Sequence, residues 1–326
     1  MLPSPAVTAL PFASTPPGAS DVAGRWRGGP ATNGTGDSPW NVGVQRAAGP
    51  AALAGPAALT VGGCCACQLP LDATCAAEAR RVFREAAAVL GLAEELVYDG
   101  MTMASELAAN TLHAHDNVES DDVGPWPLAG APEMWVYLRG VSGRWELVCK
   151  VFDSLRGWKD DVAPVPGSAA LDAEGGRGLQ VVAELSGGRW GHHLTRSRLG
   201  GWKVPGKAVW FAQPVPGAGV AAHARCPRLA PGQVGRTLEA MLIDRGLGKG
   251  LLRAAEPGDA MSVLSVRCGL SVWCRDSMIW WRDRDGNYEQ RVPADLVDTS
   301  EKIVCTCEEL ECGEDSIPAG LGQACR

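Results

Sequence analysis

The chain has 326 residues, of which 46% are hydrophobic, and its formal net charge is −7. A chain of this length usually forms about two domains, and its apolar fraction is sufficient for a packed core. The acidic balance, without a strongly basic segment, argues against direct nucleic-acid binding and against binding to an anionic membrane surface.

Targeting signals are weak at the beginning of the chain. The opening stretch MLPSPAVTALPFASTPPGAS has no charged start and carries prolines within its apolar part, so it makes a poor signal peptide. No run of 18 apolar residues occurs, so we expect no membrane span. We therefore expect a cytoplasmic protein, in which most of the 12 cysteines would be reduced.

The first half of the chain is predicted to contain a disordered segment followed by strands and helices. Residues 1–56 are rich in Pro, Gly, Ala and Ser and are predicted to be disordered. Residues 59–70 are typical of an edge strand. Two helices should follow, one from an N-cap at Asp72 to a stop at Gly91, and one over residues 93–113.

Strands and a glycine-led helix are expected next. The alternation of apolar residues predicts strands over 134–140 and 145–153, followed by a long loop to Gly176. The stretch GGRGLQVV then begins a helix, and two strands over 189–195 and 207–214 complete the unit. Residues 216–227 are interpreted as a linker because they are rich in Pro, Gly and Ala.

The C-terminal part is predicted to form a small α+β accessory domain over residues 228–310. A helix near 233–246 precedes two or three short strands, with an Asp-Gly turn inside DRDGNYEQR. No histidine follows His223 and no acid/base pair is recognisable, so we expect docking or partner recruitment rather than a second catalytic site. The acidic residues 311–326 are predicted to be a loose tail.

Two common nucleotide-binding motifs are absent. A Walker A loop would need a glycine at Ile243 and a serine or threonine at Gly250. A dinucleotide-binding fingerprint would need a third glycine at Val181. Two cysteine clusters lack the paired spacing of zinc sites, and we interpret them as buried or incidental thiols: Cys64, Cys65 and Cys67, and Cys305, Cys307 and Cys312.

The stretch ELAANTLHAH, residues 106–115, is the most informative one. Glu106 and Asn110 are four residues apart in a predicted helix, so they should lie on one face. The amide oxygen of Asn110 suits Mg²⁺, which keeps several waters and shares ligands with substrate phosphates. Glu106 could orient or deprotonate a nucleophile that attacks a γ-phosphate. His115, just beyond, is interpreted as a helix-end residue.

Four motifs in order resemble those of a known superfamily. ELAAN, DSLRG, GGRGLQVV and GKAVWF are similar to motifs of the Bergerat-fold (GHKL) ATPases, and most similar to those of actinobacterial regulators related to anti-sigma-factor serine kinases. The resemblance covers residues 59–214. It implies a histidine-kinase-like ATPase domain over 57–215 with a two-layer α/β sandwich, and hence an α+β protein with a small C-terminal α+β domain.

The resemblance also implies ATP and Mg²⁺ as cofactors, with a role for each matching residue. Glu106 would be the catalytic base and Asn110 the Mg²⁺ ligand, while Asp153 would accept a hydrogen bond from the adenine amino group. The loop between Asp153 and Gly176 would be a nucleotide lid. The remaining nucleotide-binding positions would be Gly157, Gly176, Arg177, Gly178 and Leu179.

Several functions are compatible with such a site. No histidine precedes His113, which argues against a sensor histidine kinase, and the chain is short for a gyrase-like or chaperone ATPase. We expect a cytoplasmic regulator that transfers the γ-phosphate to Ser or Thr of a protein partner, such as a sigma factor or its antagonist, or that uses ATP hydrolysis as a switch. The alternative is a degenerate module that binds a partner without turnover, since Leu155 and Ala208 replace a glycine and a threonine of the family pattern. A homodimer is a further assembly to consider.

Overall fold

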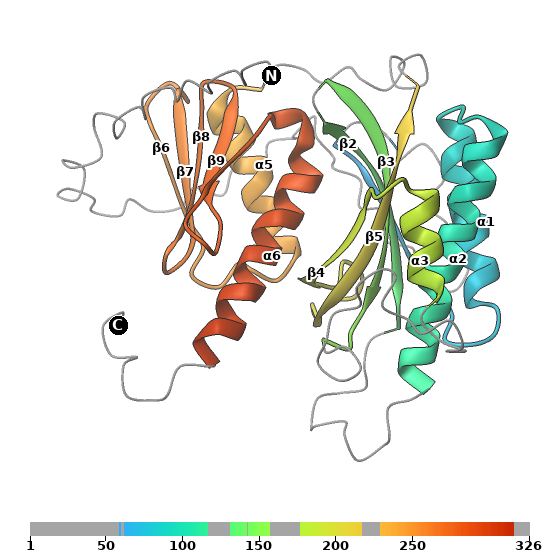
Figure 1. Cartoon of the computed structure of the whole chain (residues 1–326). Helices are drawn as coiled ribbons and strands as arrows, with labels where there is room; N and C mark the ends of the chain where they lie inside the picture. Colours follow the sequence, from blue (N-terminus) through green and yellow to red (C-terminus); the bar gives the residue numbers. More distant parts are fainter. Residues whose placement is uncertain are drawn as a thin grey trace, which may run out of the picture. The chain divides into compact units, whose positions relative to one another are not determined.

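The structure, a computed structural model, describes residues 59, 62–116, 131–141, 143–156, 177–216 and 229–315 (Figure 1). Over these residues it contains two antiparallel five-stranded sheets and five α-helices, which confirms the predicted α+β class. None of the described helices combines the length and the apolar character needed to cross a membrane. The segment predicted as disordered (1–56) and most of the segments predicted as lid (between Asp153 and Gly176) and as linker (216–227) lie outside the described residues.

The first sheet, here called sheet A, is built from the N-terminal half of the described chain. Its order is β1-β2-β3-β5-β4, with every neighbouring pair antiparallel. As predicted, the residues after position 59 form an edge strand. The strands of sheet A are β1 (Cys64–Gln68), β2 (Glu133–Val141), β3 (Arg144–Asp153), β4 (Trp190–Arg196) and β5 (Pro205–Val215).

The central strand β3 contributes to two cores because its side chains alternate between the faces of sheet A. Leu147, Cys149 and Val151 join the cluster under the first helices. Val148 and Phe152 join a different cluster on the opposite face. Sheet A is therefore buried on both sides along β3.

Three helices cover the first face of sheet A: α1 (Cys75–Val89), α2 (Glu94–Asp116) and α3 (Arg177–Leu185) (Figure 1). The expected N-cap at Asp72 is wrong by two residues. Asp72 Oδ1 instead accepts a hydrogen bond of 2.7 Å from the amide of Thr74, which is the N-cap of α1. This turn places the aspartate before the helix, and α1 begins at Cys75.

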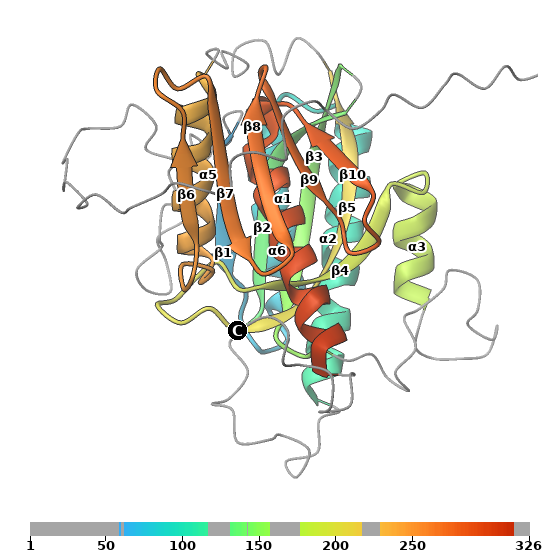
Figure 2. The same ribbon diagram turned by 90° about the vertical axis from the view of Figure 1, so that its left-hand side faces the viewer.

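The second sheet, sheet B, is a meander of five short strands in the order β10-β9-β8-β7-β6 (Figure 2). Helix α5 (Pro231–Asp244) packs against β7 and β8, as the predicted helix followed by strands indicated. The Asp-Gly turn joins β9 to β10, with Gly286 at φ +83°. The strands are β6 (Leu252–Ala255), β7 (Met261–Arg267), β8 (Leu270–Arg275), β9 (Met278–Arg282) and β10 (Tyr288–Arg291).

The prediction of a loose acidic end is wrong for the part that the structure describes. After a short 3₁₀ turn, η3 (Pro293–Asp295), helix α6 runs over Leu296–Asp315. Val297, Ile303, Val304 and Cys307 are buried at helical spacing, and this apolar stripe stabilises the helix. Residues 316–326 lie outside the described ranges.

Helix α6 contacts the second face of sheet A, at β2 and β4 (Figure 1). One apolar cluster includes Trp135 and Phe152 from sheet A, Leu238 from α5, Trp281 from sheet B and Ile303 from α6. The C-terminal elements thus share a buried core with sheet A.

Candidate functional site

Helix α2 presents Glu106 and Asn110 on the side that is not buried against the sheet. Leu107 and Ala108, which lie between them, are buried in the core, whereas Glu106 and Asn110 are half-buried. The helical period therefore separates an apolar stripe from a polar one within ELAAN. This is the arrangement expected from the four-residue spacing.

The first turn of α3 lies against these two side chains. A Cβ atom added to Gly178 would be 2.7 Å from Glu106 Oε2 and 3.3 Å from Asn110 Oδ1. Only a glycine fits at this distance without displacing Glu106. Residues about seventy positions apart are thus brought together, and the first turn of α3 lies beside the carboxylate and the amide.

The neighbours of Gly178 differ in what they can contribute. Arg177 is exposed, so its guanidinium can reach a ligand. Leu179 is buried in the apolar core, so only its backbone is available to a nucleotide. Gly157 and Gly176, the two other predicted glycines, lie outside the described residues.

Asp153 ends β3 and is 3% exposed, and its carboxylate is already engaged. Its Oδ2 lies 2.9 Å from Nζ of Lys207, which is its partner residue on β5. Its Oδ1 accepts a 2.8 Å hydrogen bond from the Leu155 amide and lies 3.3 Å from Nε2 of His115. Three donors therefore surround the carboxylate to which the motif resemblance gives the adenine-binding role.

These donors determine the ionisation of Asp153. Burial, the largest single influence, would raise the pKa of the carboxyl group. The hydrogen bond from His115, the charge of Lys207 and the Leu155 amide together outweigh burial, so the pKa of Asp153 lies below its usual value. A carboxylate offers about four lone-pair sites, so about one acceptor site remains.

Close backbone packing holds β5 against the end of β3. A Cβ atom on Gly206 would be 2.2 Å from the carbonyl oxygen of Asp153. The glycine before Lys207 therefore lets β5 approach closely enough for the ion pair. The sequence analysis did not predict that Lys207 and His115 contact Asp153. For Lys207, a signal was available: it follows a glycine in the GKAVWF motif.

Among the described residues at the α2–α3 contact, the amide oxygen of Asn110 is the group that we assign to a metal ion. No group of three His, Cys, Asp or Glu side chains in the described ranges is arranged to hold a metal ion. Cys64 and Cys67 on β1 belong to cores on opposite faces of sheet A. Burial raises the pKa of Cys65 to about 11, so that thiol is protonated at neutral pH.

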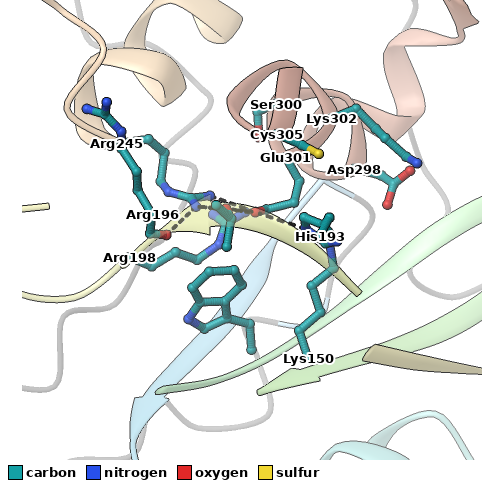
Figure 3. Close-up of polar contacts among 12 residues, drawn as sticks. Lys150, His193, Arg196, Arg198, Arg245, Asp298, Ser300, Glu301, Lys302 and Cys305 are labelled. Atoms are coloured by element: carbon teal, nitrogen blue, oxygen red, sulfur yellow. Dashed lines mark hydrogen bonds and ion pairs between the residues drawn. The ribbon is translucent and has the colours of Figure 1, made fainter. Parts of the chain in front are cut away.

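A second polar cluster lies between sheet A and α6, with Glu301 at its centre (Figure 3). The carboxylate is 1% exposed. Its Oε2 accepts hydrogen bonds from Arg198 (2.7 Å) and Arg245 (2.6 Å), and its Oε1 accepts one from the Thr195 hydroxyl. We call these residues, together with Lys150 and His193, the Glu301 cluster.

Lys150 and His193 complete the Glu301 cluster on the sheet side (Figure 3). Burial lowers the pKa of Lys150 to about 8, although the charges of Glu301 and Asp298 oppose this shift. Burial, reinforced by Lys150, lowers the pKa of His193 to about 4. His193 is therefore neutral at pH 7, and its Nε2 lies 3.3 Å from Lys150 Nζ and 3.7 Å from Oε1 of Glu301.

The Glu301 cluster connects α6 to sheet A. Glu301 comes from α6 and Arg245 from the residue after α5, whereas its other members come from sheet A or the segment after β4. Each charged group has an opposite charge or an acceptor within reach, as buried charges require. We therefore interpret the cluster as the polar part of the α6 interface.

No protein-family model matches this chain, and no curated protein matches its sequence.

Proposed function

We propose that the protein binds ATP with Mg²⁺ between α2 and α3 and acts as a regulator of a protein partner. The observation that carries this proposal is the contact of Gly178 with Glu106 and Asn110. A helix start attracts phosphate, an amide oxygen suits Mg²⁺, and a carboxylate can activate a nucleophile. The contact between α2 and α3 brings all three groups next to one another: Glu106 and Asn110 come from α2 and the helix start from α3.

The proposed reaction is transfer of the γ-phosphate. Glu106 takes the proton of a Ser or Thr hydroxyl of the partner, the hydroxyl oxygen bonds to the γ-phosphorus, and the bond to the β-γ bridging oxygen breaks to release ADP. Asn110 would hold Mg²⁺, which would supply positive charge against the phosphates, and Arg177 can contact the same phosphates. With water in place of the hydroxyl, the same residues hydrolyse ATP, and the protein works as a switch. The motif resemblance favours a sigma factor or its antagonist as the partner.

At the other end of the nucleotide, Asp153 would use its remaining acceptor site for the adenine amino group. Lys207, 2.9 Å away, is a donor that suits a neighbouring ring nitrogen of the base. The pair therefore offers one acceptor and one donor side by side.

The same ion pair supports a second candidate function, that of a partner-binding module without turnover. Asp153 already accepts from Lys207 and Leu155 and lies close to His115. If these contacts leave no room for adenine, the domain binds a protein partner through its surface. The contact between α2 and α3 then only stabilises the fold.

Calorimetric titration with ATP and Mg²⁺ tests the proposal. Asp153→Ala should weaken binding by roughly ten- to a hundredfold, since a buried hydrogen-bonding partner is lost. Glu106→Ala should leave binding intact and abolish release or transfer of the γ-phosphate. Wild-type protein that binds no nucleotide would favour the partner-binding module.

A further inference from the structure

The turn that follows Asp153 is held from three directions. The Leu155 amide donates to Asp153 Oδ1 (2.8 Å), and the Leu155 carbonyl accepts from Lys207 Nζ (2.5 Å). The next residue, Arg156, donates from Nη2 to Oε2 of Glu308 on α6. Four consecutive residues thus connect the proposed base-binding carboxylate to the C-terminal helix.

Glu308 is placed to anchor this turn. It is completely buried, and its Oε1 accepts from Nε of Arg196 on β4 while its Oε2 accepts from Arg156. Arg196 fixes the carboxylate against sheet A. The other oxygen is then presented to the turn at a fixed position, because a buried carboxylate held by two charged donors has little freedom to move.

We infer that Glu308 is a positioning residue for the nucleotide site: through Arg156 it holds the turn that orients the carboxylate of Asp153. The inference rests on the proposed function. Asp153 has to keep one acceptor site directed at the base while Leu155, Lys207 and His115 occupy the others. A shift of the turn moves the Leu155 amide and therefore redistributes the donors around that carboxylate.

A consequence is that the C-terminal helix takes part in nucleotide binding, although 152 residues separate Arg156 from Glu308. Binding linkage is reciprocal, so a nucleotide that stabilises the turn also stabilises α6. ATP should therefore slow hydrogen exchange in the α6 backbone around Glu308 as well as at Leu155.

The test compares Arg156→Gln, Glu308→Gln and their double variant with the wild-type full-length chain. Arg156→Gln is the gentler change, because the Arg156 side chain is 36% exposed and Glu308 keeps Arg196 as its partner. Each single variant should bind ATP roughly tenfold more weakly, and the double variant should be no weaker than either single one, since the pair acts as a unit. Without nucleotide, the Leu155 amide should exchange faster in each variant.

Two matched controls separate positioning from a general loss of stability. Glu311→Gln lies one turn further on α6 and removes a carboxylate that contacts Arg196 and Arg267 rather than Arg156, so ATP affinity should stay within about twofold. Arg156→Lys keeps the charge, and Arg156 uses a single nitrogen for its contact, so this variant should restore most of the affinity.

Three outcomes would overturn the inference. The first is equal ATP affinity and equal Leu155 exchange in wild type and Arg156→Gln. The second is an equal loss of affinity in Glu311→Gln, which would mean that α6 acts only through overall stability. The third is wild-type protein that binds no ATP, which would overturn the proposed function together with this inference; the first two leave the proposed function intact.

Discussion

The ammonium group of Lys207 lies 2.9 Å from Oδ2 of Asp153, and both side chains are buried at neighbouring positions of β5 and β3. A carboxylate in this position was expected to be free for adenine. Its engagement means that the base has to fit between a donor and an acceptor that already satisfy each other. Any nucleotide that binds here therefore competes with, or joins, an internal ion pair.

The Lys207–Asp153 pair should be important for stability. Asp153→Asn leaves the buried Lys207 without its counter-charge and should cost about 3–5 kcal/mol of unfolding free energy, whereas adding Lys207→Met should recover part of this loss. Because the folded-state pKa of Asp153 is lowered, its contribution is present above the unfolded value of about 3.9 and is lost as pH falls through the folded value. Urea unfolding of wild type, Asp153→Asn, Lys207→Met and the double variant between pH 7 and pH 2 measures both effects; additive losses of unfolding free energy would show that the pair does not couple.

Asn110 should account for the effect of Mg²⁺ on ATP binding. Asn110→Ala removes the only protein oxygen proposed for the metal, so the ratio of ATP affinities with and without Mg²⁺ should fall towards one. ATP affinity in EDTA should change little. Calorimetry under both conditions checks this, and an undiminished Mg²⁺ effect in the variant would remove Asn110 from the metal site.

Gly178→Ala should separate stability from function. The new Cβ would meet only the mobile end of Glu106 and the Asn110 amide, and alanine gains up to about 1 kcal/mol over glycine within a helix, so the folded state should not suffer. The same methyl group displaces Glu106 Oε2, 2.7 Å away, so γ-phosphate transfer should fall strongly. Gly206→Ala serves as a comparison. The new Cβ would clash with the backbone of Asp153, so this variant should be less stable than wild type. A fully active Gly178→Ala protein would contradict the proposed site.

His193 should make the protein less stable at mildly acidic pH. Its folded-state pKa is about 4, against about 6.5 in the unfolded chain, so the unfolded state binds more protons between these values. Stability should therefore fall by on the order of 3 kcal/mol as pH drops from 6.5 to 4, and His193→Gln should remove this slope. His192→Gln, at the more exposed neighbouring position, is the comparison: burial lowers the pKa of His192 as well, but less, so the slope should fall less. Equal slopes in wild type and His193→Gln would show that His193 is protonated in the folded state.

A chain that ends at Gly217 should not fold cooperatively. It lacks α6, so Trp135, Tyr137 and Phe152 of sheet A lose their cover, and Lys150 and Arg198 lose Glu301. Near-ultraviolet circular dichroism and urea unfolding measure the loss. A cooperative, ATP-binding product would support the sequence-based division into an ATPase domain over 57–215 and an independent accessory domain.

Local patterns in the sequence were good guides to structure. Glu106 and Asn110 share a polar stripe because a four-residue spacing fixes their direction on any helix. The alternation along β3 likewise predicted its two faces. Both inferences need only the geometry of one element, which is why they required no knowledge of the rest of the chain.

Relationships between elements were less predictable. Lys207 faces Asp153 because of the register of β3 and β5, which no single stretch of sequence reveals. Helix α6 was missed because Glu301 and Glu308, which read as solvent-facing charges, are buried against arginines of distant segments. Carboxylates on the buried face interrupt the apolar stripe of α6 and so weaken the apolar period by which helices are recognised.

The ionic character of the α6 interface has a consequence for biosynthesis. During translation, β3, β4 and β5 emerge well before α6, so Lys150 and Arg198 have no counter-charge from Glu301 until that residue follows them. Sheet A can pair its strands and bury its first face during this interval, but its second face is completed only by the late helix. When α6 docks, a displacement by one helical turn would carry each carboxylate about 5.4 Å from its partner, so the nascent chain has a single register in which to complete the fold.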